Sequence, residues 1–153
     1  MISNKKIYDL VIIGAGFAGL YSLYKAKLAK LNVIAIERAS NVGGTWYWNR
    51  YPGARCDVES MQYSYQFSNE LQEEWEWTEK YATQPEILKY ANHVADRFKL
   101  RENIQFNSEI KSAKFNSDKN HWELINNTNQ LIKTKFCIMA TGCLSTLNKP
   151  KFK

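Results

Sequence analysis

The segment that decides the fold is Leu10–Gly19, which reads Leu-Val-Ile-Ile-Gly-Ala-Gly-Phe-Ala-Gly. An apolar run typical of a buried strand enters a Gly-x-Gly-x-x-Gly pattern, and a helical pattern follows from Phe17. Gly14 allows the tight turn out of the strand, Gly16 lets a phosphate approach the backbone, and Gly19 lets the helix pack close to the strand. The pattern predicts a dinucleotide site in which the helix N-terminus faces the pyrophosphate.

The acid after the next predicted strand indicates which nucleotide this site prefers. Val33–Ile36 is apolar and leads to Glu37, 18 residues after Gly19, close to the spacing of about 20 that is typical of the fingerprint. A carboxylate here accepts hydrogen bonds from both ribose hydroxyls and repels a 2′-phosphate, so the site favours FAD or NAD over NADP. Arg38 weakens this exclusion slightly, because its charge can turn toward a phosphate. A basic start before an apolar run is also typical of a secretory signal, but the glycines and Asp9 count against that alternative.

The composition excludes several classes of protein. A chain of 153 residues has room for one domain with a core, and its aromatic content of 14% needs a core, a planar ligand or a partner to cover the rings. The net charge of +6 comes from scattered lysines, so we expect no nucleic-acid partner, and no segment has 18 uninterrupted apolar residues, so we expect no membrane span. Cys56, Cys137 and Cys143 form no CxxC pair, which predicts neither a disulfide scaffold nor a metal site and favours the cytoplasm.

Hydrophobic periodicity predicts an α/β fold in which a right-handed βαβ unit precedes a β-meander. The expected strands are 7–13, 33–37, 104–106, 109–115, 121–126, 130–134 and 136–140; the expected helices are 17–31, 58–67 and 84–100; and 40–57 is expected to be a loop. The last of these strands is a continuous apolar run, so we expect a buried parallel strand in which Cys137 is a buried thiol.

A second block of sequence carries a family resemblance. Gly43–Asp57 reads Gly-Gly-Thr-Trp-Tyr-Trp-Asn-Arg-Tyr-Pro-Gly-Ala-Arg-Cys-Asp, and it is similar to the type I Baeyer–Villiger monooxygenases, of the cyclohexanone and phenylacetone monooxygenase kind. Glu59–Tyr65, Glu74–Tyr81, Gln84–Leu88 and the Ala140–Gly142 element agree with this resemblance. The glycine fingerprint and Ala-Thr-Gly occur in many flavoenzymes, whereas the Gly43–Asp57 block is much more specific.

The resemblance implies a chemistry and a set of roles. It implies FAD as the bound cofactor, NADPH as the reductant, and oxygen and a small-molecule ketone as the substrates, with an ester or lactone as the product. Gly43–Trp46 would pass under the flavin, Asp57 would orient an arginine at the flavin face, and Arg55 would contact the nicotinamide cofactor. Tyr63 would lie near the flavin and the backbone of Ile110 near the adenine. A surface ion pair at Arg55 and Asp57, and plain packing of Tyr63, are the competing interpretations.

The predicted site can be stated residue by residue. Cofactor contacts are expected at Gly14, Gly16, Phe17, Gly19, Glu37, Arg38, Gly44, Thr45, Trp46, Arg55, Asp57, Tyr63, Ile110, Ala140, Thr141 and Gly142. Asp57 is the expected catalytic residue, and no metal is expected.

The resemblance also implies an incomplete enzyme. Residues 1–153 would be the N-terminal part of a truncated, Rossmann-like FAD-binding domain with an inserted meander, and the NADPH-binding domain would be absent, since no second glycine fingerprint follows. The aromatic-rich stretch Trp46–Trp77 would then be partly uncovered. The alternatives are an FAD-binding remnant without activity, or a fragment of an N- or S-oxidising flavin monooxygenase. A flavin disulfide reductase needs a redox cysteine pair, which Cys56 lacks.

Overall fold

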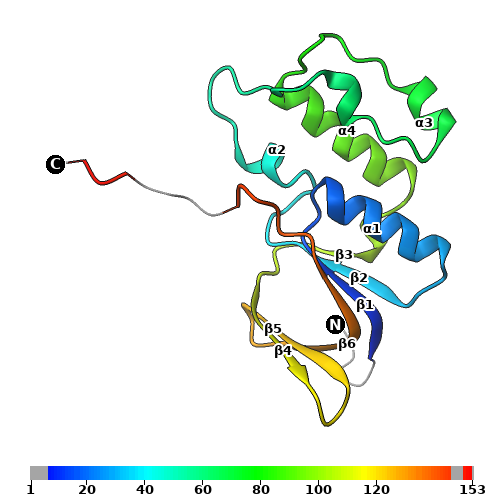
Figure 1. Ribbon diagram of the computed structural model, residues 1–153, viewed down its shortest axis with the longest axis vertical. Helices are drawn as coiled ribbons and strands as arrows, with labels where there is room; N and C mark the ends of the chain where they lie inside the picture. The colour runs from blue at the N-terminus through cyan, green and yellow to red at the C-terminus, as the bar shows by residue number, and fades with distance from the viewer. Residues whose placement is uncertain (1–6, 146–149, 153) are drawn as a thin grey trace.

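The computed structural model describes residues 7–145 and 150–152, which form one six-stranded sheet with helices gathered on one side (Figure 1). The strands are β1 (Tyr8–Ile13), β2 (Val33–Ile36), β3 (Ile104–Gln105), β4 (Ile110–Asn116), β5 (His121–Asn126) and β6 (Leu131–Met139), in the order β3-β2-β1-β6-β5-β4. The helices are α1 (Phe17–Leu28), α2 (Thr45–Trp48), α3 (Asn69–Glu74) and α4 (Gln84–Arg97), with 3-10 turns η1 (Ser60–Tyr63) and η2 (Arg101–Asn103). No helix in the described ranges is long and apolar enough to cross a membrane.

The βαβ unit predicted from the glycine fingerprint is confirmed. β1 pairs in parallel with β2, with Leu10 opposite Val33. The apolar side of α1 packs on the same face of β1 as Leu10, and this cluster also takes in the first buried residues of β2 and part of α4. α1 ends at Leu28 rather than near Leu31, because Lys30 adopts a positive φ of 55° and the Leu31 N–H returns to the Ala26 carbonyl.

The two strands expected over 130–134 and 136–140 are one strand, β6. Its first half pairs antiparallel with β5 and its second half parallel with β1, so it closes the meander and extends the parallel sheet at once. The expectation of a buried strand is wrong for Phe136, which is 69% exposed. Phe136 lies opposite Leu10, but it takes no part in the cluster that α1 forms there. Cys137, on the opposite face, is partly buried, and burial raises the pKa of its thiol.

The meander covers the face of the sheet that α1 leaves open. Leu124 of β5 and Ile132 of β6 are buried against Val11 and Ile36 of the parallel strands. Figure 1 shows how this is possible, because β4 and β5 bend away beneath β1, β2 and β3. The predicted polar turns are confirmed, and Asn120 and Asn129 take the left-handed conformation that asparagine tolerates.

The region between β2 and α4 departs most from expectation. The helix expected over 58–67 is wrong, because only the 3-10 turn η1 forms there. The short helix α3 was not predicted, although Ser68 supplies a regular N-cap by accepting a hydrogen bond from the Leu71 N–H (3.2 Å). Both elements are too short for hydrophobic periodicity to distinguish them from loop.

The aromatic stretch is also better covered than expected. Trp46 is 8% exposed, and Trp75 and Trp77 are partly buried, so the expectation of an uncovered stretch is wrong for these three rings. Tyr90 of α4 packs against the last two, with its centroid 5.1 Å from those of Trp75 and Trp77. The expectation holds at Trp48, which is 50% exposed.

Candidate cofactor-binding site

The turn after β1 lies against the residue that follows β6. Gly14 has a φ of +103°, and a Cβ added there would lie 2.5 Å from the Ala140 carbonyl oxygen, just after β6. A Cβ at Gly19 would lie 2.0 Å from the Gly14 carbonyl oxygen. Both distances exclude a side chain, so the tight turn and the close helix packing predicted for these glycines are confirmed.

Two glycine loops, Gly14–Gly16 (the first) and Asn41–Gly44 (the second), face each other at the start of α1. Gly16 is the N-cap of α1, and among the described residues no side-chain cap accepts a hydrogen bond from the first N–H groups of the helix. A Cβ at Gly16 would lie 3.4 Å from the Gly44 Cα, and one at Gly44 would lie 3.0 Å from the Gly16 Cα. The Gly43 N–H donates to the Ala15 carbonyl (3.1 Å) and ties the loops together. A helix dipole with free N–H groups, beside a backbone without side chains, suits a phosphate ligand.

Glu37 is buried at the end of β2 and turned toward the first glycine loop. It is 4% exposed, one carboxylate oxygen accepts from the Ala15 N–H (2.6 Å), and the other accepts from the Ala39 N–H (2.8 Å). The sequence placed an acid at the edge of the site but gave no sign of these two bonds. The carboxylate keeps further lone pairs, so it can hold the loop and still accept hydrogen bonds from a ribose.

The adenine end of the predicted site is assembled around Glu37. The Ser108 N–H donates to the Glu37 carbonyl (2.9 Å), which brings Ile110, at the start of β4, beside the end of β2. Arg38 lies with its guanidinium 4.9 Å from the centre of the Trp48 ring. That contact is a cation–π arrangement on an exposed residue. The Glu37 carboxylate accepts its hydrogen bonds from the Ala15 and Ala39 N–H groups, and Arg38 is not among its partners in the described residues.

The loop that carries Arg55 and Asp57 is held by a strap, which we define as Glu79–Gln84. Ala54 and Cys56 exchange backbone hydrogen bonds with it: the Cys56 N–H donates to the Ala82 carbonyl (3.0 Å), and the Gln84 N–H donates to the Ala54 carbonyl (2.8 Å). The strap also holds the Arg55 side chain, which forms an ion pair with Glu79 (2.9 Å).

This arrangement bears on the roles expected for Arg55 and Asp57. The sequence offered a surface ion pair at Arg55 and Asp57 as the alternative, whereas Arg55 pairs with Glu79, and both members of that pair are about half exposed. Asp57 is an exposed residue of the same loop. Contact of Arg55 with a nicotinamide, and of Asp57 with an arginine at a flavin, stay predictions. The strap itself could not be predicted, because no local pattern pairs residues about 26 positions apart.

The aromatic rings of Phe17 and Trp46, which follow the two glycine loops in the sequence, both pack against Tyr63. The Tyr63 ring lies edge-on to Phe17 and to Trp46, with centroid distances of 5.4 and 5.5 Å. Burial removes water from the phenol and raises the pKa of Tyr63. Tyr63 therefore packs against Phe17 and Trp46, and its contact with a flavin stays a prediction. No sequence pattern predicted the role of Tyr65, whose hydroxyl donates to the Phe17 carbonyl (2.5 Å) and fixes the first turn of α1.

The predicted residues thus come together at the carboxyl ends of β1, β2 and β6. The group comprises Gly14, Gly16, Phe17, Gly19, Glu37, Gly44, Thr45, Trp46 and Ala140. Thr141 and Gly142 continue from β6 as an exposed segment, and the Ser145 hydroxyl donates to the Thr141 carbonyl (2.5 Å). Within the described part of the chain, no cluster of three or more His, Cys, Asp or Glu side chains could hold a metal.

The comparison with known families agrees with this geometry. A model described as pyridine nucleotide-disulphide oxidoreductase matches residues 11–153. The chain belongs to this family. Its three cysteines are nevertheless free thiols, so the described residues hold no redox disulfide.

The individual relatives are proteins named as monooxygenases. The chain is 44% identical over 147 residues to a Baeyer-Villiger monooxygenase of Pseudooceanicola batsensis, covering 95% of this chain and 27% of that protein. It is also 44% identical over 153 residues to the phenazine N-monooxygenase PhzNO1 of Lysobacter antibioticus, covering 99% and 28%. The solved structure of an oxidized steroid monooxygenase bound to NADP superposes with a TM-score of 0.92 at 52% identity, covering 96% and 28%. The resemblance to Baeyer–Villiger monooxygenases is confirmed, and the chain spans little more than a quarter of these relatives' length.

Proposed function

We propose that this chain binds FAD and forms the flavin-holding part of an NADPH-dependent monooxygenase. The observation that carries the proposal is the pair of facing loops at Gly16 and Gly44, beside an uncapped helix N-terminus and a buried Glu37. The N–H groups of the first turn of α1 would hold the pyrophosphate, and Glu37 would accept hydrogen bonds from the ribose.

The remaining predicted contacts follow the same edge of the sheet. Trp46 and Tyr63 would pack beside the flavin ring system, and Ala140 would close the site from β6. When bound, FAD supplies the hydride and oxygen chemistry of the reaction, and the protein's part is to bind it, orient it and exclude water. Asp57, exposed on the loop that the strap holds, would orient an arginine from outside this sequence.

We further propose that residues 1–153 are the N-terminal part of the FAD-binding domain and that the NADPH-binding domain lies outside this sequence. Ketones and oxygen are the proposed substrates, and esters or lactones are the products. Three free thiols favour a reducing compartment, the cytoplasm.

A second candidate has an observation of its own. A relative named phenazine N-monooxygenase is as similar to the chain, at 44% identity, as the relative named Baeyer-Villiger monooxygenase. The residues in hand hold the cofactor rather than the substrate in either reaction. N-oxidation therefore stands as the alternative, and an FAD-binding remnant without activity as the third possibility.

Two measurements test the proposal. Quenching of flavin fluorescence on titration with the purified chain should give saturable FAD binding, and NADP⁺ should not compete. A chimera in which residues 1–153 replace the matching segment of the Pseudooceanicola batsensis enzyme should oxidise a cyclic ketone. Loss of FAD from the chimera would contradict the cofactor role, and oxidation of phenazine without lactone would favour the second candidate.

A further inference from the structure

The second glycine loop, Asn41–Gly44, is anchored by a guanidinium from a distant segment. Arg101, in η2, donates from Nη1 to the Asn41 side-chain oxygen (2.8 Å). It donates from Nη2 to the Asn92 side-chain oxygen (2.6 Å) and from Nε to Asp96 (2.5 Å), both on α4. One planar group therefore joins the loop to α4 through three acceptors.

The same Asn41 oxygen also holds the backbone of the loop. It accepts from the Val42 N–H (2.8 Å), and Val42 is fully buried. The next residue, Gly43, donates to Ala15 and lies so close to α4 that an added Cβ would stand 2.5 Å from the Leu88 Cδ1. The loop is therefore fixed between the first glycine loop and α4, with Asn41 at its entry.

We propose that Arg101 is a positioning residue for the cofactor site, acting through Asn41 on the loop that places Gly44 opposite Gly16. The inference rests on the proposed FAD function. The contact of Arg101 with Asp96 contributes little to holding the loop, because the Asp96 carboxylate is 61% exposed. The bond to the partly buried Asn41 carries the effect, and only a guanidinium offers three N–H directions in one plane.

The experiment removes each end of the contact separately. Arg101→Met and Asn41→Leu both leave the loop without its anchor, whereas Asn41→Asp keeps an oxygen for Arg101 and for the Val42 N–H. Arg97→Met is the matched control, because Arg97 is a second guanidinium from the end of α4 that pairs with Glu74 instead. Near-ultraviolet circular dichroism shows which variants keep the fold.

The first readout is hydrogen exchange in the absence of FAD. Arg101→Met and Asn41→Leu should speed exchange at the amides of Val42, Gly43 and Trp46, and leave the meander unchanged. Asn41→Asp and Arg97→Met should keep exchange in the loop at the rate of the unmodified chain. Equal loss of protection in Asn41→Asp and Asn41→Leu would overturn the proposal.

The second readout is the FAD dissociation constant from flavin fluorescence. If the freed loop holds its binding conformation about one-tenth of the time, the constant rises about tenfold in Arg101→Met and Asn41→Leu. Folded variants with unchanged loop exchange and unchanged FAD affinity would overturn the proposal. If Arg101→Met does not fold, the two Asn41 variants decide. If the unmodified chain binds no FAD, the proposed function fails, while the exchange comparison still decides whether Arg101 orders the loop.

Discussion

Glu37 is the residue at which the proposed nucleotide binding and the local structure depend on one carboxylate. Its two oxygens already accept hydrogen bonds from the Ala15 and Ala39 N–H groups. Glu37→Ala removes these acceptors inside a buried site, so we expect a loss of about 1–3 kcal/mol in the free energy of unfolding. FAD affinity should fall by a similar free energy, because charge-assisted bonds to the ribose are lost as well. Urea denaturation and titration calorimetry measure the two effects.

The control for Glu37 is an acid without such contacts. Glu102→Ala changes an exposed carboxylate in η2 and should leave both quantities unchanged. Glu37→Gln keeps the size of the side chain and one oxygen acceptor, so its free energy of unfolding should lie between those of Glu37→Ala and the unmodified chain. Equal FAD affinity in Glu37→Ala and the unmodified chain would remove the ribose role, even if stability falls.

At the scale of residues, the sequence predicted backbone requirements better than side-chain partners. The roles of Gly14 and Gly19 follow from local geometry, and an added Cβ at either position would clash as expected. The pairing of Arg55 with Glu79, and of Arg101 with Asn41, depends on how distant segments meet. No spacing rule carries that information, so these contacts needed the structure.

The junction between α3 and α4 gives a prediction at the scale of elements. The Arg97 Nε–H donates a bifurcated hydrogen bond to both oxygens of the Glu74 carboxylate, at 3.1 and 2.9 Å, and this contact lowers the pKa of Glu74 below its ordinary value of 4.5. Because the folded pKa is lower than the unfolded one, Glu74 stabilises the fold above about pH 4.5, and this contribution is lost as pH falls through the folded pKa.

Glu74→Gln tests that linkage directly. We expect the unmodified chain to have the higher urea midpoint near neutral pH, and the difference to vanish in acid as Glu74 is protonated. Glu73→Gln, one residue earlier on α3, is the control. A difference between Glu74→Gln and the unmodified chain that stays constant down to acid pH would show that the hydrogen bond to Arg97 does not produce the effect.

At the same scale, long periodic segments were predictable and short ones were not. α1 and α4 have enough turns for an apolar face to repeat, and both begin at the residues expected from the sequence. β6 was divided in two because Thr134-Lys135 interrupts its apolar pattern, yet Thr134 is buried and pairs with both neighbouring strands. Burial of a polar residue by two partner strands is a tertiary effect, and periodicity cannot anticipate it.

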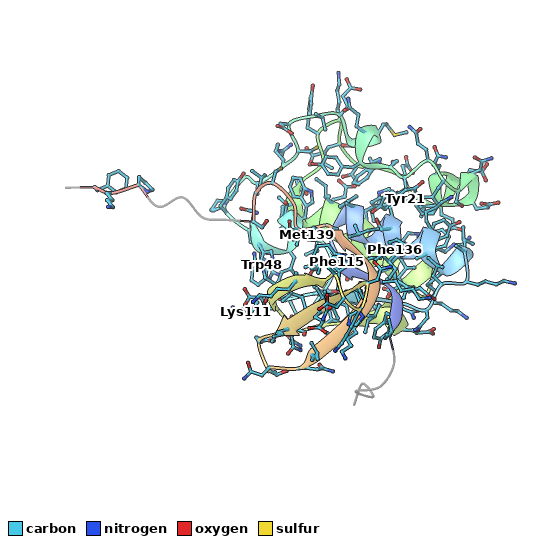
Figure 2. The ribbon with its side chains drawn as sticks, turned by 60° about the horizontal axis from the view of Figure 1, so that its bottom comes forward. Tyr21, Trp48, Lys111, Phe115, Phe136 and Met139 are labelled. Carbon is cyan, nitrogen blue, oxygen red and sulfur yellow. The ribbon has the colours of Figure 1, made fainter. Side chains whose placement is uncertain are left out.

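For the whole molecule, β6 presents the most exposed apolar strip of the sheet. Phe136 is 69% exposed, and Ile138, two positions along on the same face, is 39% exposed. Met139 on the other face is 63% exposed, and Figure 2 labels Phe136 and Met139 along β6. Exposed apolar patches of this kind promote association. We expect concentration-dependent self-association and binding of an apolar dye, both reduced in Phe136→Lys. Leu28→Lys, at a position on the end of α1 that is 60% exposed, is the control, and light scattering coupled to gel filtration is the measurement.

The whole molecule also sets what the isolated chain can do with substrates, and we expect no coupled turnover of NADPH and ketone. Hydride transfer needs a nicotinamide held against the flavin, but the sequence has one glycine fingerprint, and Glu37 disfavours a 2′-phosphate there. Asp57 is exposed with no arginine among its hydrogen-bond partners in the described residues, so the charge stabilisation expected of it has no second member. Proximity and charge stabilisation each contribute many orders of magnitude in rate, so the loss of both should abolish the reaction.

NADPH oxidation with cyclohexanone, and product detection by mass spectrometry, test this against the Pseudooceanicola batsensis enzyme as a positive control. Stoichiometric lactone from the purified chain would show that a complete site exists within these 153 residues.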